Sequence, residues 1–325
     1  MTAATRLKTA ARDLMRTVAG AALGLGLTAA LVGSLPTAAM AQDPAVAVSA
    51  PAPRAGGNGP ALWVIRDADS TIYLFGTVHV LRPTTAWGSD RVDAAFDSAA
   101  RLILEVANPD DQAAAMPLIQ QYGISPETPL SSLLTADELV ALDTAARAMG
   151  LTGAQMDPLR PWLAALTLSV APLTRAGYDP KSGVDLLLKA RAEAAGKPVT
   201  GFETIDEQIR ILAGFPEAGQ LDFLRSTLDD FEGATVELDK LVTAWAAGDV
   251  EAIETVGVEP MRDASELMYQ SLLVNRNANW AGQIQTLLEG SGTVFIAVGA
   301  AHLAGDDSVQ VQLAHRGVTV ERVPN

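Results

Sequence analysis

Strand-forming runs gather near the two ends of this sequence, and a long helix-forming stretch separates them. Leu62 to Arg66 and Thr71 to Phe75 are β-rich runs joined by a polar turn, a pattern typical of a hairpin. Leu102 to Val106 is a short apolar run of the buried-strand type. Thr293 to Val298 and Val318 to Val323 show the same character. The sequence therefore predicts an α/β fold with a mixed central sheet built from N- and C-terminal strands.

The middle of the chain is a large helical insertion into that sheet. Residues 111 to 290 follow a helical period, with one strand-like interruption at Lys197 to Phe202. A helix from Ser89 to Ala100 can begin on the Ser89 cap, and Gly196 can close a helix from Val184 to Ala195. These signals predict few strands in the insertion, and no repeating βαβ array.

The first 41 residues have the composition of a secretory signal peptide. Basic residues precede a charge-free apolar run from Val18 to Leu35, and Ala39 to Ala41 offers an A-x-A cleavage site. Glycines interrupt the apolar run, which favours cleavage over a retained membrane anchor. We expect an exported protein, periplasmic or secreted, with a disordered Pro/Gly-rich tether at 42–60 and a single domain at 61–325.

Composition excludes several classes of site. The chain has no cysteine, which rules out disulfides, thiolate metal sites and cysteine nucleophiles. Its formal net charge is −15, without the basic face that releases counterions from a phosphate backbone. Nucleic acid is therefore not an expected partner.

Two of the three histidines occupy matched settings. A strand-like run leads into Gly76-Thr77-Val78-His79, and another leads into Gly299-Ala300-Ala301-His302. Each imidazole should project from a loop just past the carboxyl end of a strand, where ligands gather in open α/β sheets. If the two strands are parallel neighbours, both rings face one pocket. The repetition also suggests two weakly related halves.

Glu105 is the strongest carboxylate candidate to join the two histidines. A charged residue between Leu104 and Val106 in a core strand is costly unless it is paired or ligating. Imidazole pairs with carboxylates serve either metal binding or acid/base chemistry, and an edge-strand surface position is the alternative for Glu105. The third histidine, His315, ends a short helix before a turn, and we assign it to capping.

Together these motifs resemble the TraB/GumN family, whose eukaryotic relatives include the Tiki membrane-tethered metalloproteases. The residues that carry the resemblance are Tyr73 to His79, Leu104 with Glu105, Lys197 to Glu203 with Gln208, and Val298 to Gly305. The resemblance spans about Leu62 to Val323. It implies a metal-dependent, hydrolase-like site made by His79, His302 and Glu105.

The resemblance also draws attention to residues outside the two histidine motifs. Arg276 and Asn277, near Trp280, are expected to bind substrate, with a structural ion pair as the alternative for Arg276. Glu203 follows a predicted strand and is a supporting or alternative metal ligand; the alternative is a charge at a helix N-terminus. Asp185, on the preceding helix, is a weaker candidate.

The function predicted from these residues is an exported metallohydrolase acting on peptide or related amide bonds. A ligand set of nitrogen and oxygen suits zinc, manganese or cobalt, and Glu105 would be either a ligand or a general base. The main alternative is a non-catalytic protein that sequesters a peptide or haem. A third interpretation is a protein interaction surface on the helical middle. The oligomeric state stays open.

Overall fold

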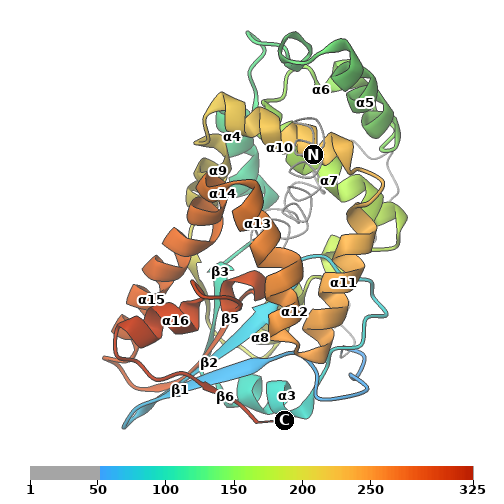
Figure 1. The fold of residues 1–325 in the computed structure, drawn as a ribbon. Helices are drawn as coiled ribbons and strands as arrows, with labels where there is room; N and C mark the ends of the chain where they lie inside the picture. The colour runs from blue at the N-terminus through green and yellow to red at the C-terminus, as the bar shows by residue number, and fades with distance from the viewer. Residues whose placement is uncertain (1–51, 325) are drawn as a thin grey trace.

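A computed structural model describes residues 52–324, and in it six strands form one mixed sheet (Figure 1). Their order across the sheet is β4-β3-β5-β2-β1-β6. The strands are β1 (Leu62–Arg66), β2 (Ser70–Thr77), β3 (Arg101–Val106), β4 (Val199–Glu203), β5 (Gly292–Gly299) and β6 (Glu321–Arg322). Strands from both ends of the chain therefore build the sheet, as the sequence predicts.

Helices make up most of the remaining chain between residues 90 and 315. In chain order they are α3 (Asp90–Ser98), α4 (Gln112–Gly123), η1 (Leu130–Leu133), α5 (Ala136–Arg147), α6 (Gly153–Met156), α7 (Pro161–Arg175), η2 (Pro180–Ser182), α8 (Val184–Ala194), α9 (Ile205–Ala213), α10 (Glu217–Asp229), α11 (Ala234–Ala247), α12 (Val250–Ile253), η3 (Glu254–Val258), α13 (Glu259–Ala264), α14 (Glu266–Tyr269), η4 (Gln270–Val274), α15 (Asn275–Leu287), η5 (Ala300–Leu303) and α16 (Val309–His315). The segments η3 and η4 are π-helical.

Four of the six strands run parallel and share one carboxyl edge. β2 lies parallel to β5, from Ser70 beside Gly292 to Thr77 beside Gly299, and β3 lies parallel to both β4 and β5. β1 pairs antiparallel with β2, which confirms the predicted hairpin. The two strands that lead into the histidine motifs are therefore parallel neighbours. Their carboxyl ends meet at the same place.

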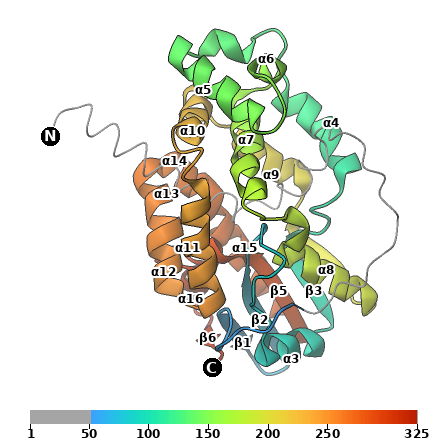
Figure 2. The same ribbon diagram turned by 90° about the vertical axis from the view of Figure 1, so that its right-hand side faces the viewer.

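Each face of the sheet is covered by helices, because the strands alternate apolar side chains between two cores. Figure 1 shows α15 and α16 on one side and α3 and α8 on the other. The α15 side buries Ile103, Trp280, Ile284, Ile296 and Leu313 together. The opposite side buries Phe75, Phe96, Leu104, Trp245 and Phe295. The large helical part continues this second core beyond the sheet, with α4 to α7 and α10 at its far end (Figures 1 and 2).

Most element boundaries follow from local signals in the sequence. Ser89 accepts a hydrogen bond from Val92 N and caps α3, and Gly196, with φ 67°, follows the end of α8 as expected. The predicted strand from Val318 to Val323 is the exception, since only β6 pairs there. Val318, the first residue of this predicted strand, belongs to the C-terminal end of α16, because its N–H donates to Leu313 O after the turn at Gly317.

The segment before β1 is partly described. Residues 52–60, predicted as the end of a disordered tether, lie against the α3 end of the domain: Trp87 N and Gly88 N both donate to Pro53 O at 2.9 Å. The predicted signal peptide at 1–41 and residues 42–51 of the tether lie outside the described residues. Within residues 52–324, no helix is both long and apolar enough to cross a bilayer.

Candidate functional site

The four parallel strands each deliver one ionisable side chain to their shared carboxyl edge. Glu105 lies near the end of β3, Glu203 is the last residue of β4, His79 follows β2, and His302 lies in η5 after β5. Arg276, in the first turn of α15, reaches the same place from the covering helix. We call these five residues the edge cluster. Residues far apart in sequence meet here because the parallel topology aligns the strand ends.

Glu105 is the centre of the edge cluster. Its side chain is 4% exposed, and its Oε1 lies 3.8 Å from Nε2 of both His79 and His302. Gly299 N donates to the same oxygen at 2.7 Å, so the second Gly-x-x-His motif fixes Glu105 through its backbone. Burial raises the pKa of the Glu105 carboxyl, although Arg276 and His79 act in the opposite direction.

Arg276 joins the two glutamates and His302. Its Nη2 donates to Glu105 Oε2 at 2.6 Å and to Glu203 Oε2 at 2.9 Å, and its Nε donates to Glu203 Oε1 at 2.9 Å. Its Nη1 lies 3.1 Å from both Leu272 O and His302 Nε2. The five N–H groups of a guanidinium are all accounted for by these contacts. The side chain is 4% exposed.

His79 is backed by a carboxylate. Its Nδ1 lies 3.0 Å from Asp185 Oδ1 on α8, which leaves Nε2 as the lone-pair nitrogen. Gly183 makes this approach possible, because a Cβ there would collide with the His79 carbonyl oxygen. Burial alone lowers the pKa of His79, but the Asp185 and Glu105 carboxylates outweigh it and the net shift is upward. Among the described residues, buried Nε2 has no hydrogen-bond partner.

His302 is backed by a neutral amide. Its Nδ1 lies 2.5 Å from Asn277 Oδ1, while Asn277 Nδ2 donates to Asp307 O at 2.8 Å. Asn277 therefore accepts from Nδ1–H, and Nε2 carries the lone pair that faces Arg276. The indole of Trp280 lies against the imidazole, with ring centroids 4.3 Å apart. The side chain is fully buried.

Two further residues complete the hydrogen bonding of the glutamates. Gln208 Nε2, from α9, donates to Glu105 Oε2 at 3.2 Å and to Glu203 Oε2 at 3.1 Å. Trp280 Nε1 donates to Glu203 Oε1 at 2.9 Å. Each carboxylate oxygen on Glu203 thus has donors, which is what a buried carboxylate requires.

The buried charges of this region do not balance. With neutral histidines, Glu105, Glu203 and Asp185 carry three negative charges against the single positive charge of Arg276. An uncompensated buried charge is costly, so this region favours additional positive charge, as protons or as a cation. The upward pKa shifts of His79 and Glu105 have this origin in part.

The two imidazole nitrogens and the Glu105 oxygen are of the right chemical type for a divalent ion, but they do not surround one position as a complete set of ligands. Around a tetrahedral ion bound at 2.0–2.2 Å, ligand atoms lie about 3.4 Å apart, close to the 3.8 Å that separates Glu105 Oε1 from each imidazole Nε2. Both Nδ1 atoms are already held, as in histidines that ligate metals. Within residues 52–324, however, no group of three His, Asp or Glu residues stands in a metal-holding arrangement. The lone pair on His302 Nε2 instead accepts a hydrogen bond from Arg276 Nη1.

The members of the edge cluster are all predicted from the sequence, but several of their contacts are not. Arg276 and Asn277 hold other members of the site through their polar groups, and their predicted binding of substrate stays a prediction. Asp185, the weakest candidate, is the residue that orients His79. Gln208 bridges two carboxylates, a role that no local signal predicts. His315 is the exposed last residue of α16, outside the edge cluster.

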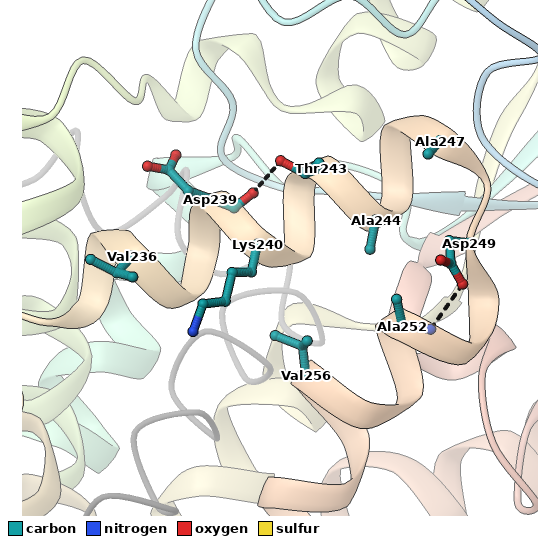
Figure 3. Close-up of a pocket in the computed structure, with 9 residues that line it drawn as sticks. All are labelled: Val236, Asp239, Lys240, Thr243, Ala244, Ala247, Asp249, Ala252 and Val256. Carbon is teal, nitrogen blue, oxygen red and sulfur yellow. Dashed lines mark hydrogen bonds between the residues drawn. The ribbon is translucent and has the colours of Figure 1, made fainter.

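A separate pocket of about 620 Å³ lies over α11, α12 and η3 (Figure 3). Small apolar side chains line most of it, and none of its lining residues belongs to the edge cluster. Each of its charged side chains has a structural partner: Asp239 is paired with Arg82 and Tyr178, Lys240 with Glu237, and Asp249 caps α12. This pocket therefore carries no candidate chemistry.

Comparison with known proteins agrees with the motifs. The model of the TraB/PrgY/gumN family matches residues 61–322, a range that contains the whole edge cluster. The chain belongs to this family. The prediction from the sequence motifs is thereby confirmed, and the family match extends across the sheet and the helical insertion alike.

Two bacterial proteins are similar to this chain at low identity. An uncharacterized protein of Treponema pallidum is 24% identical over 266 residues, which cover 76% of this chain and 78% of the relative. YbaP of Escherichia coli, also described as uncharacterized, is 23% identical over 256 residues, covering 78% of this chain and 92% of YbaP. No solved structure matches the chain. Membership of the TraB/PrgY/gumN family is thus shown, while the names of these relatives assign no activity.

Proposed function

We propose that this protein is an exported, metal-dependent hydrolase of peptide or related amide bonds, with its reaction centre at the edge cluster. One observation carries the proposal: two imidazole Nε2 atoms lie 3.8 Å from the same Glu105 oxygen, each ring is held through its Nδ1, and His79 Nε2 is buried without a partner among the described residues. Export rests on the sequence of residues 1–41.

His79, His302 and Glu105 would hold the ion. Zinc, manganese or cobalt suits these nitrogen and oxygen donors; when bound, such an ion lowers the pKa of a water and polarises a carbonyl group. Asp185 and Asn277 fix the imidazole rings so that both Nε2 lone pairs point inward. A divalent ion would also balance the excess negative charge of the buried region.

Arg276 gains a second role in this proposal. Its Nη1 lies 3.1 Å from His302 Nε2, and it would have to release that nitrogen for His302 to serve as a ligand. The freed N–H would be a donor beside the reaction centre, where it could hold the carbonyl oxygen of a substrate amide. The remaining N–H groups stay on Glu105 and Glu203, so the guanidinium keeps its position.

The test is elemental analysis of residues 42–325 after loading with zinc, manganese or cobalt and desalting. We expect close to one ion per chain, and its loss in His79→Ala and in His302→Ala. His315→Ala is the matched control, because it removes an exposed histidine outside the edge cluster. A loaded protein that then cleaves peptides in a random library completes the case. Metal-free wild-type protein under every loading condition would refute the proposal and favour a non-catalytic binding protein.

A further inference from the structure

A pocket of about 460 Å³ lies directly beside the edge cluster, between α9, α14, η4 and α15. Its lining includes Glu203 and Arg276, whose side chains are 7% and 4% exposed, so the pocket meets the cluster at its buried end. Figure 1 shows α9, α14 and α15 on the same side of the molecule. This is where a substrate can approach the residues assigned above.

Three polar side chains that have no role in the edge cluster line the pocket along η4 and α15. Ser271, Asn275 and Asn279 all face it, and the two asparagines are exposed. None of the three side chains forms a hydrogen bond with the residues from 52 to 324. Asn is a poor helix former, because its amide competes with the backbone. Two exposed asparagines one turn apart therefore disfavour the helix without any compensating contact in the structure.

The spacing of the two asparagines matches an extended peptide. Residues four apart on an α-helix are separated by about 6 Å along the axis, and alternate residues of an extended chain repeat every 6.4–6.8 Å or so. An Asn amide offers both a donor and an acceptor, as a backbone peptide group does. Asn275 and Asn279 can therefore each form hydrogen bonds with one backbone amide group of the same bound peptide, and these two groups would be two residues apart in that peptide.

Apolar residues of the same pocket supply contacts suited to side chains of such a peptide. Ile211 and Phe215 come from α9 and the residues just after it. Leu267 of α14 is 47% exposed and presents an apolar surface. The charged lining residues comprise two glutamates and two arginines, so the pocket has no net preference for a strongly charged ligand. Phe215 is its only aromatic lining residue and is buried, so no exposed ring offers a platform for a sugar.

We infer that this pocket binds the backbone of an extended peptide segment through Asn275 and Asn279 and directs it toward Arg276 and Glu203. The inference rests on the proposed function for the reaction at the edge cluster, but the binding it describes does not require a metal ion. It names the substrate class as unfolded or extended polypeptide, recognised mainly by its main chain and without a strict sequence motif.

The test is fluorescence polarisation of a labelled pool of random ten-residue peptides titrated with residues 42–325, without metal. We expect saturable binding that Asn275→Ala/Asn279→Ala weakens about thirtyfold, if each amide contributes a typical net hydrogen-bonding free energy. Gln285→Ala is the matched control, because it removes an exposed amide from α15 outside the pocket. Competition by the same peptides with N-methylated backbones should be weak.

Several results would overturn the inference. They are the absence of peptide binding, equal binding by the double variant, equal competition by N-methylated peptides, or displacement of the label by maltohexaose. Zinc binding at the edge cluster without peptide binding would refute this inference alone. Peptide binding through the two asparagines in a protein that takes up no metal would refute only the proposed hydrolase.

Discussion

The two Gly-x-x-His segments share a sequence pattern but end in histidines with opposite surroundings. His302 is fully enclosed: an amide holds Nδ1, Arg276 contacts Nε2, and Trp280 lies against its ring. His79 is held on one side only, by the Asp185 carboxylate, and its Nε2 has no partner among the described residues. The same four-residue pattern therefore produces one fixed imidazole and one with an available lone pair.

The difference arises from the elements packed against each segment. After Gly299 the chain turns into η5, where His302 contacts side chains of α15, whereas after Gly76 it meets the start of α8, where Val184 N donates to Val78 O. A carboxylate behind an imidazole makes the ring more basic, while a neutral amide only orients it. We therefore expect the proton and metal affinity of His79 to depend on the charge behind it, and His302 to act as a ligand of fixed orientation whose surroundings also maintain the fold.

The largest effect should come from removing Arg276, the cation on the His302 side. Arg276→Met leaves Glu105 and Glu203 buried without their counter-charge, and we expect the free energy of unfolding in urea to fall by about 3–5 kcal/mol. Arg175→Met is the control, because that residue forms only an exposed pair with Glu232 and should cost less than about 1 kcal/mol. Equal losses for the two variants would show that Arg276 is not the structural partner described here.

Direct packing between the two segments provides the next test. A Cβ added at Gly76 would lie 3.1 Å from Ala300 Cα in the second motif, which is tighter than normal contact. We expect Gly76→Ala to destabilise the protein by about 1–3 kcal/mol through overpacking. Gly56→Ala is the matched control, since a Cβ there has no neighbour within 4 Å. Unchanged stability in Gly76→Ala would mean that the motifs separate at little cost.

The carboxylate behind His79 should matter for metal binding. Asp185→Asn keeps the shape of the side chain but removes its charge, and we expect zinc affinity to fall about 10- to 100-fold, as for other residues that orient a ligating histidine. Competition against a chromogenic chelator measures this change. Asp239→Asn, which alters a carboxylate paired with Arg82 away from the edge cluster, should leave zinc affinity unchanged. Wild-type affinity in Asp185→Asn would remove the distinction between the two histidines.

Much of the fold could be predicted because its signals are local. Strand-like apolar runs, the Ser89 cap and the glycine after α8 each act within a few residues, and the sheet follows from strands at both ends. Val318 does not join the predicted strand, because its backbone N–H donates to Leu313 O at the end of α16, a preference that apolar composition does not reveal.

The candidate site could be predicted only in part, for the same reason. His79, His302 and Glu105 stand out because each is a polar residue beside a strand-like apolar run. Their partners come from other elements: Asp185 approaches through Gly183, and Gln208 from α9 bridges two glutamates. Such contacts depend on how helices pack on the sheet. A single sequence therefore selects candidate residues better than it assigns their roles.

The smallest predicted effect is a dependence of stability on pH. In the metal-free protein the pKa values of both His79 and Glu105 are raised, so the folded state holds protons more tightly than the unfolded chain. This stabilisation is complete below the ordinary values of about 4.3 for Glu and 6.5 for His, and is lost as pH rises through the folded pKa values. We expect the urea midpoint in EDTA to be lower at pH 8.5 than at pH 6.0. His79→Gln should reduce the difference, because it removes the one imidazole backed by a carboxylate. A midpoint that rises with pH would contradict the assigned direction, and an unchanged slope in His79→Gln would place the titrating group elsewhere.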